Sequence, residues 1–503
     1  MLNARMRSNP VSWDVLHTQD WANTYAINGM QSWLLIHDPY DASRLVPDVA
    51  ERWTVSDDGK VYTFALKRGV RWHDGAPLTA RDVAYNLNLA VSPPEPARNY
   101  MQAKLGGLIA QVEQPDELTV RITAKRVSAA LLESLAQAQM ALYPSHKGKD
   151  ELKDSAFIGS GPFKMVSYAK DSEMKTARDP NFYGKDSRGG QLPYLDGVQW
   201  FLMNGELAFS AFRSGKTDTT AHDADWAYAQ QDTVRRSLPD ARFDPWITNR
   251  QDVLFNQKPP FTDQRVRAAF SLAYDRQAHD DVVNRGGGIP LASPMLPASR
   301  GGIWALPTEE MAQRPGFRAD RKAEDRARAQ QLLKEAGVDP KALTINLLGS
   351  SFFNIVGESM ASRLREDLGV NVRLRLEPPA QNTSSLTTGD YDLTHLSASI
   401  VTDEPLEMIG TFVRIGGGRN YSKWSDPQID ALLDQQDGTL DPVRRKAIIQ
   451  DLQRQALDRA FTIPITWTPV VAIARGYVKN QGDQLTAFHP AAWFRWDQVW
   501  LDR

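Results

Sequence analysis

The chain contains 503 residues, more than the roughly 250 to 300 over which one hydrophobic core grows, so we expect at least two lobes. The composition, 42% hydrophobic and 24% charged, is that of a globular protein and excludes a disordered chain. A formal net charge of −2 without long runs of like charge disfavours nucleic acid and anionic membrane surfaces as partners. The absence of cysteine excludes disulfides and thiolate sites, and the short apolar runs argue against membrane spans.

A hairpin and a capped helix are the first clear elements. Residues 51–67 predict two strands around the Asp-Gly turn at 58–59, with one strongly apolar face on the second strand. A second Asp-Gly pair, at 74–75, turns the chain into a predicted helix. Thr79 is its expected N-cap, and Asp82 completes a capping-box-like start.

The middle of the chain predicts mixed structure followed by a βαβ unit. Short strands are expected over 159–184, and helical periodicity is found over 206–215 and 263–278. The unit itself consists of a helix at 323–336 stopped by Gly337, a strand at 343–348, a helix at 355–368 and a strand at 370–376. This spacing predicts a parallel sheet. Two amphipathic helices near the C-terminus, over 425–438 and 441–461, are expected to be structural.

The loop at 349–354, "GSSFFN", follows the first strand of the βαβ unit. Ligands of open α/β sheets bind beyond the carboxyl ends of the strands, and a mix of polar and aromatic residues suits contact with a small molecule. A capped turn without any ligand explains the same residues, so both interpretations remain open.

One stretch, "VRWHDGAPLTARDVAYN" at 70–86, resembles a reactive cluster because it contains His73 and Asp74. Catalysis there would need a third partner and a cleft. An Asx turn and an imidazole with one hydrogen bond need neither, so we favour the structural interpretation.

Motifs for catalysis, metal binding and cofactor binding are absent. None of the eight histidines has the i, i+4 spacing with a glutamate that zinc hydrolase helices use. Residues 210–217 fail as a phosphate-binding loop because Ser210 stands where that loop needs glycine. There is no GxSxG or GxGxxG sequence. We therefore expect a protein that is not an enzyme and has no catalytic residue, metal or cofactor.

Blocks spread over the whole chain resemble those of one family. They include "LVPDVAERWTVSDDGKVYTFALKRGVRWHDGAPLTARDVAYNLNLA" (45–90), "GSGPFKMVSY" (159–168), "FNQKPPFTDQRVRAAFSLAYDRQA" (255–278) and "YSKWSDPQIDALLDQQDGTLDPVRRKAIIQDLQRQAL" (421–457). In this order the blocks resemble bacterial extracellular solute-binding proteins, family 5. That family serves ABC importers of dipeptides and oligopeptides and also includes nickel, haem, opine and oligosaccharide binders.

The resemblance implies an α/β, two-lobed periplasmic-binding-protein fold of type II, with mixed sheets flanked by helices and a hinged ligand cleft. It assigns 1–40, 160–248 and 478–503 to lobe I, 41–159 to an extra subdomain and 249–477 to lobe II. It further implies a periplasmic, monomeric protein whose signal peptide has been removed. The lobes would close on a small-molecule solute, and an ABC permease in the inner membrane would recognise the closed form.

The resemblance also implies where a peptide would be anchored. Peptide-binding members hold the ammonium group on an aspartate four residues before a proline, and counting back from Pro405 gives Val401. Burying an ammonium group without its carboxylate costs about 2 to 5 kcal/mol, or roughly 30-fold to several thousand-fold in affinity. We therefore expect a polar non-peptide solute, such as an opine, a glycoside or an oligosaccharide-like compound. A di- or oligopeptide is the alternative if Asp403 or Asp20 takes the amine.

Solute contacts carried over from the family come from several segments. Trp21 and Phe352 would supply stacking area, and Arg250 would supply a charge for an anionic group. An imidazole at His395 would make binding sensitive to pH near about 6 to 7. For each contact a structural role is the alternative. The full set of expected contacts is Gln19, Asp20, Trp21, Tyr100, Arg250, Phe352, Asn354, His395, Ser397, Ser399, Val401 and Asp403.

Overall fold

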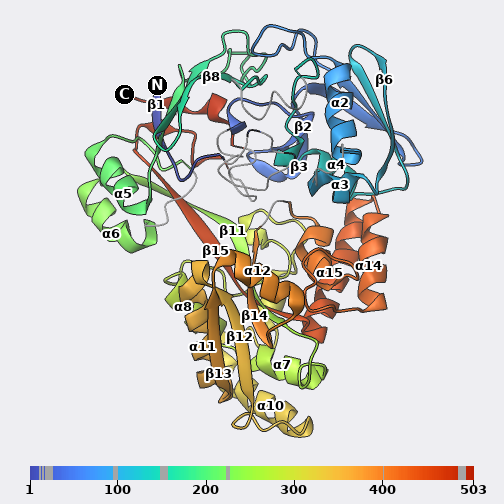
Figure 1. The fold of residues 1–503 in the computed structure, drawn as a ribbon, viewed down its shortest axis with the longest axis vertical. Coiled ribbons are helices and arrows are strands. Elements are labelled where there is room, and N and C mark those ends of the chain that lie inside the picture. Colours follow the sequence, from blue (N-terminus) through green and yellow to red (C-terminus); the bar gives the residue numbers. More distant parts are fainter. Residues whose placement is uncertain are drawn as a thin grey trace. The chain divides into compact units, whose positions relative to one another are not determined.

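The computed structural model describes residues 1–10, 13, 16, 27–93, 100–147, 157–221, 227–399, 402–484 and 494–503. The chain forms two compact units, Met1–Trp246 with Val470–Arg503, and Ile247–Pro469. It passes from one unit to the other within β11 (Arg242–Phe255) and again within β15 (Thr462–Ala474) (Figure 1).

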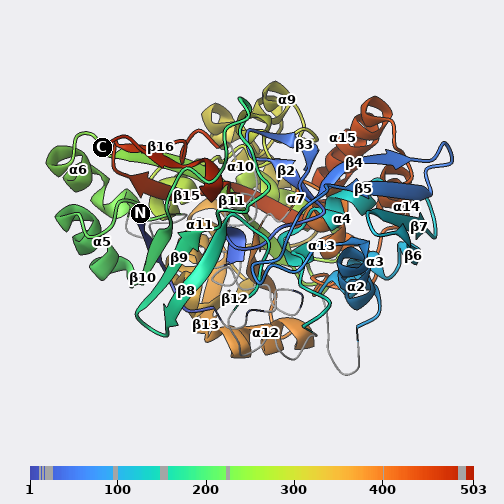
Figure 2. The ribbon, with the colours of Figure 1, turned by 90° about the horizontal axis from the view of Figure 1, so that it is seen from above.

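Two four-stranded sheets build the first unit. One has the order β1 (Leu2–Met6), β10 (Val198–Leu202), β9 (Glu173–Arg178), β8 (Phe163–Ala169), with β1 parallel to β10. The other is antiparallel, with the order β4 (Ala50–Val55), β5 (Val61–Leu66), β7 (Thr119–Ala124), β6 (Ile109–Asp116) (Figure 2). Two short pairs are β2 (Leu35–Asp38) with β3 (Asp41–Pro47), and β16 (Val478–Lys479) with β17 (Trp500–Leu501).

The helices of the first unit include α2 (Ala80–Val91), α3 (Tyr100–Leu105), α4 (Ala130–Leu135), α5 (Gly205–Ser214) and α6 (Ala227–Ser237). The helix predicted over 206–215 is confirmed as α5, which ends at Gly215 in the left-handed conformation. The predicted helix after the second Asp-Gly turn is α2. It begins after Thr79, whose backbone N–H donates to the Asp82 carboxylate at 2.9 Å.

The predicted hairpin is confirmed as β4 and β5. In β5 the side chains of Tyr62, Phe64 and Leu66 alternate with half-buried ones and are themselves buried, as the apolar alternation predicts. α2 packs on β6 and β7, so it covers part of the same sheet. The short strands expected over 159–184 are β8 and β9.

A five-stranded mixed sheet is the centre of the second unit. Its order is β13 (Asn371–Glu377), β12 (Thr344–Ser350), β14 (Leu393–Ser399), β11, β15. β12 is parallel to both β13 and β14, whereas β11 is antiparallel to β14. The predicted βαβ unit is therefore confirmed as β12, α11 (Asn354–Leu368) and β13, preceded by α10 (Lys322–Glu335).

Close packing of α11 on the sheet depends on a glycine. A Cβ at Gly357 would lie 2.9 Å from Leu376 Cδ2, so a larger residue there would require the Leu376 side chain to move. The remaining helices of this unit include α7 (Gln264–Ala273), α8 (Arg276–Val283), α9 (Thr308–Gln313), α12 (Pro379–Thr388), α13 (Thr411–Val413), α14 (Pro427–Asp437) and α15 (Pro442–Arg459). The last two are the amphipathic helices predicted near the C-terminus.

The helical periodicity over 263–278 belongs to two helices, not one. α7 ends at Ala273, and α8 begins after Asp275, whose carboxylate accepts the backbone N–H of Ala278 at 3.0 Å. An N-cap within the periodic stretch therefore starts a new helix.

The observed units and the predicted lobes have different limits. The units divide at 246/247 and at 469/470, inside the strands β11 and β15, whereas the predicted lobes divide at 248/249 and 477/478. The first unit contains both the predicted lobe I and the predicted extra subdomain. Their separation at 40/41 and 159/160 stays a prediction.

Candidate functional site

The carboxyl ends of β12 and β14 form the edge of the second unit where a ligand is expected. β12 ends at Ser350, whose hydroxyl accepts the backbone N–H of Phe352 at 3.3 Å and so turns the chain toward α11. Phe352 is 63% exposed and Ile355 is 55% exposed, so two large apolar side chains at this edge face outward. Asn354, another expected contact, is the first residue of α11.

His395 lies on β14 opposite Val253 of β11 and is 7% exposed. The ring of Phe353 packs edge-on against its imidazole at a centroid distance of 5.4 Å. Its Nε2 is buried and has no hydrogen-bond partner within the described parts of the chain. Burial lowers the pKa of His395 to about 4, so the imidazole is neutral at pH 6 to 7. This pKa lies below the expected range of about 6 to 7, and the pH sensitivity of solute binding at His395 stays a prediction.

Two serines follow His395 on the same strand. Ser397 lies opposite Gln251 of β11 and is partly buried, and it shares a sheet face with His395 because side chains alternate along a strand. Ser399 lies opposite Asn249 at the end of β14, but its side chain is outside the described part of the structure.

Arg250 is engaged inside the second unit. Its side chain is 2% exposed, and its Nε lies 3.0 and 2.9 Å from the two carboxylate oxygens of Asp252. Nη2 also donates to the backbone carbonyl of Met408 at 3.0 Å, and Nη1 donates to that of Pro294. An anionic group of a solute would have to compete with Asp252 for this guanidinium. Its role as a solute contact stays a prediction.

Asp403 and Glu404 both have partners within the second unit. The Asp403 carboxylate accepts backbone N–H groups from Leu296 at 3.2 Å and from Ile303 at 3.3 Å. Glu404 forms a bidentate pair with Arg445, at 3.1 and 2.6 Å, and both side chains are nearly inaccessible to solvent. The acids nearest to Pro405 therefore hold the protein's own groups.

Four expected contacts lie outside the described residues: Gln19, Asp20, Trp21 and Val401. Tyr100 is the first residue of α3, and its side chain is also outside the description. Of the described contacts, His395, Ser397, Phe352 and Asn354 lie at the carboxyl edge of the β12–β14 sheet. Arg250 and Asp403 instead hold neighbouring chain segments.

The cluster at 70–86 is a structural assembly of the first unit. His73 Nδ1 accepts the backbone N–H of Gly159 at 3.2 Å, and His73 Nε2 donates to the Gly161 carbonyl at 3.0 Å. Asp74 accepts from His146 and from the backbone N–H of Ala76, as an Asx turn requires. Burial lowers the pKa of His73 and so favours the neutral form of the ring. The structural interpretation of this stretch is confirmed.

Sequence reasoning missed a cluster of partly buried ionisable side chains in the first unit. Asp48 accepts the backbone N–H of Trp33 at 2.7 Å and the hydroxyl of Tyr183 at 2.6 Å. Beside it, Arg495 pairs with the Asp497 carboxylate. Asp48, Tyr183, Arg495 and Asp497 line a pocket that is partly open to solvent. Their positions in the sequence are far apart, so no local pattern pointed to them.

The described residues contain no group of three or more histidine, aspartate or glutamate side chains arranged to hold a metal ion. Within the same residues, no helix is both long and apolar enough to cross a membrane.

Solved structures place this fold in a known class. The A. tumefaciens R10 protein AgaA, solved in complex with agropinic acid, superposes with a TM-score of 0.77 at 21% identity, over 100% of this chain and 99% of that chain. The fold is the two-lobed α/β fold of periplasmic binding proteins, as predicted.

The sequence comparison gives the family. Residues 44–420 match the family described as "Bacterial extracellular solute-binding proteins, family 5 Middle", and the chain belongs to this family. The probable deoxycholate-binding periplasmic protein YgiS of Escherichia coli K12 is 28% identical over 86% of this chain and 82% of its own length. The periplasmic oligopeptide-binding protein OppA of the same organism is 24% identical over 83% and 78%. The resemblance predicted from the sequence is confirmed.

Proposed function

We propose that this chain is the periplasmic solute-binding component of an ABC importer and that its solute is polar and is not a peptide. Members of the family work with ABC permeases and bind small solutes or peptides. The inner-membrane permease is accordingly the proposed protein partner, and an opine, a glycoside or an oligosaccharide-like compound is the proposed solute class.

The engagement of Asp403 and Glu404 is the observation that carries the proposal. A peptide ammonium group needs a buried acid, and position 401 carries valine. Asp403 is already bonded to two backbone N–H groups, and Glu404 is already paired with Arg445. Transferring either carboxylate to a ligand would leave its present partners unpaired inside the protein, at a cost of about 1 to 3 kcal/mol for each neutral group.

The side chains at the carboxyl edge support an uncharged, hydroxyl-rich solute, which favours the glycoside and oligosaccharide-like candidates over the opines, whose carboxylates are ionised at pH 7. His395 is neutral at pH 7, Ser397 and Asn354 are uncharged, and Phe352 offers exposed aromatic area. Hydroxyl groups of a solute can bond to the imidazole and to the serine, and a sugar-like ring can pack on the aromatic face. The charge of Arg250 is balanced by Asp252, which favours no net charge on the bound compound.

A di- or oligopeptide is the second candidate, because OppA is named for oligopeptides. In that case Asp20, which lies outside the described residues, would hold the ammonium group.

Isothermal titration calorimetry of the purified chain tests the proposal. A panel of di- to pentapeptides is compared with opines and with neutral glycosides. We expect no peptide to bind with micromolar affinity and at least one non-peptide compound to do so. Micromolar or tighter binding of several peptides would contradict the proposed solute class and favour the second candidate.

A further inference from the structure

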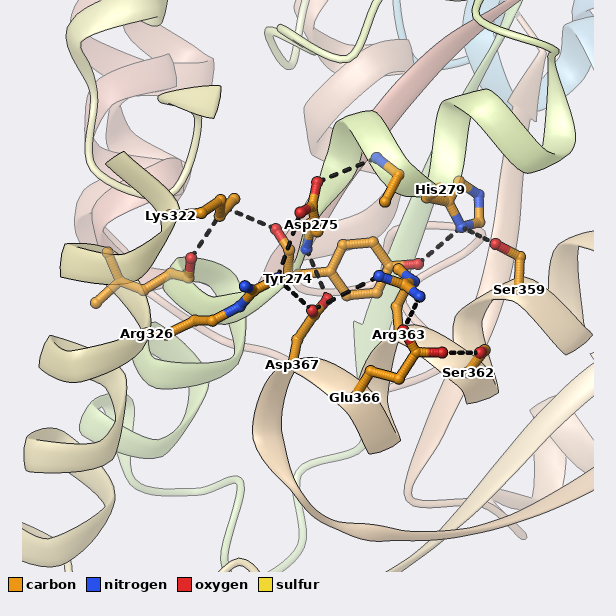
Figure 3. Close-up of polar contacts among 12 residues, drawn as sticks. Tyr274, Asp275, His279, Lys322, Arg326, Ser359, Ser362, Arg363, Glu366 and Asp367 are labelled. Carbon is orange, nitrogen blue, oxygen red and sulfur yellow. Dashed lines mark hydrogen bonds and ion pairs between the residues drawn. The ribbon is translucent and has the colours of Figure 1, made fainter. Parts of the chain in front are cut away.

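His279 is part of a buried hydrogen-bond network in the second unit, and Figure 3 shows its imidazole bonded to Tyr274 and Ser359. It is on α8 and is fully buried. Its Nδ1 lies 2.9 Å from the hydroxyl of Tyr274 and 3.0 Å from the hydroxyl of Ser359 on α11. Its Nε2 lies 3.3 Å from Oε1 of Gln251 on β11.

The tautomer of His279 follows from the amide of Gln251. The Gln251 Nε2 donates to the Thr468 hydroxyl oxygen on β15 at 2.8 Å, so Gln251 Oε1 is the atom that faces the imidazole. In this orientation of the amide, Gln251 Oε1 can only accept, so His279 Nε2 carries the proton and donates it. Nδ1 is then an acceptor with one lone pair, which the hydroxyls of Tyr274 and Ser359 share.

The charges around His279 keep it in this neutral form. Burial, with smaller contributions from the neighbouring His395 and Arg363, lowers its pKa to about 3. Arg363 is itself paired with Glu366, and its other nitrogen lies 3.8 Å from Asp367. The imidazole therefore remains a neutral donor at Nε2 throughout the physiological pH range.

Gln251 connects this network to the candidate site. It lies opposite Ser397 on β14, two residues from the Val253–His395 pair, on the same face of the sheet. A diagonal neighbour at this spacing is within reach of a long side chain. A free Gln251 amide could therefore bond to Ser397 or to the buried Nε2 of His395, which has no partner among the residues that the structure describes.

We propose that His279 is a positioning residue: it holds the Gln251 amide toward Thr468 and thereby leaves the polar groups of His395 and Ser397 to the solute. The role assigned to the solute rests on the proposed function, whereas the hydrogen-bond network exists without it. The sequence alone gives no indication of this, because Gln251, His279, Ser359 and Thr468 come from four separate elements.

Nitrogen NMR of the full chain, labelled with ¹⁵N at histidine only, tests the proposal without any solute. In the wild-type protein we expect His279 to be neutral at pH 7 with its proton on Nε2. A proton on Nδ1, or a charged ring, would overturn the network directly, and this measurement needs no variant.

The variant Gln251→Met tests the link to His395. It removes both the amide oxygen and the amide nitrogen while keeping a side chain of similar length. We expect His279 to lose its single tautomer and the ring nitrogens of His395 to change their chemical shifts.

Thr468→Val is the matched comparison, because it removes only the hydrogen bond from Gln251 Nε2 and leaves the one between Gln251 Oε1 and His279 in place. It should leave His279 as the Nε2–H tautomer while shifting the His395 signals, since the freed amide N–H can then reach β14. Unchanged His395 signals in both variants would overturn the positioning role. Peptide binding in the calorimetric panel would contradict only the proposed function, so the two failures are distinguishable.

Discussion

His73 in the first unit and His395 in the second are both largely buried histidines, but they differ in what they bond to. Both nitrogens of His73 are used, one by Gly159 and one by Gly161. His395 keeps a buried Nε2 without a partner in the described residues, next to an edge where the apolar side chains of Phe352 and Ile355 are exposed. A histidine whose ring nitrogens are both hydrogen-bonded to the protein, such as His73, has a structural role. A buried ring nitrogen without a hydrogen-bond partner, near the end of a strand, is a candidate for hydrogen bonding to a solute.

The largest loss of stability should come from removing one partner of a buried ion pair. In Arg445→Ala, Glu404 would remain buried without its cation, so we expect a loss of about 3 to 5 kcal/mol in the free energy of unfolding. Urea denaturation at pH 7 measures it. Arg444→Ala, at the exposed neighbouring position on α15, is the control and should change stability by less than about 0.5 kcal/mol. Equal losses in both variants would mean that the pair is not structurally important.

Introducing an acid at position 401 should increase the affinity of the chain for peptides. Val401→Asp supplies the carboxylate that the family resemblance implies for a peptide ammonium group, so affinity for a tripeptide should rise by about 30-fold or more. Calorimetry with a free tripeptide and with its N-acetylated form measures the gain, which should be confined to the free form. Val401→Asn is the matched control without the charge. Equal gains for both peptides would contradict the role of position 401.

The contact between His73 and the 159–161 loop depends on small residues. A Cβ at Gly159 would lie 1.8 Å from the backbone oxygen of Met30. This oxygen belongs to the main chain, so it can move only if the surrounding backbone moves with it. We expect Gly159→Ala to lower stability by about 3 kcal/mol, at the upper end of overpacking effects. Thermal unfolding measures it, with Gly418→Ala as control because nothing lies within 4 Å of the added Cβ. A stable Gly159→Ala variant would show that this loop can rearrange.

The neutral state of His395 predicts a pH-dependent stability. Its pKa is about 4 in the folded chain and about 6.5 in the unfolded chain. Between these two pH values His395 is protonated in the unfolded chain and neutral in the folded chain. The stabilising contribution is present above pH 6.5 and is lost as the pH falls toward 4. Between pH 7 and pH 5 it should lose about 2 kcal/mol.

His395→Gln should remove this part of the pH dependence. The drop in unfolding free energy between pH 7 and pH 5 should be about 2 kcal/mol smaller in the variant than in the wild type. An identical drop in both proteins would mean that His395 is protonated, or solvated, in the folded chain.

The local elements could be predicted from the sequence because their signals are local. The hairpin of β4 and β5 follows from an Asp-Gly turn and alternation, and α2 follows from Thr79 and Asp82. The break between α7 and α8 was missed because Asp275 caps a helix inside a continuous helical period. The general position of the candidate site, at the strand ends, was also predictable from the βαβ spacing.

The roles of individual site residues were less predictable, since their partners are distant in the chain. Arg250 was expected to offer its charge to a solute, but Asp252 and the carbonyls of Pro294 and Met408 use it. Asp403 is held by N–H groups about 100 residues away. The pKa of His395 depends on burial that only the folded sheet creates.

The central claim, that the solute is not a peptide, is tested most directly by native mass spectrometry of the full chain purified from its own host. The mass of the intact complex is compared with that of the denatured chain, and the released compound is fragmented. We expect one compound, or a narrow set, whose fragments contain no amide-linked amino-acid series. A distribution of di- to pentapeptide masses released on denaturation would contradict the account.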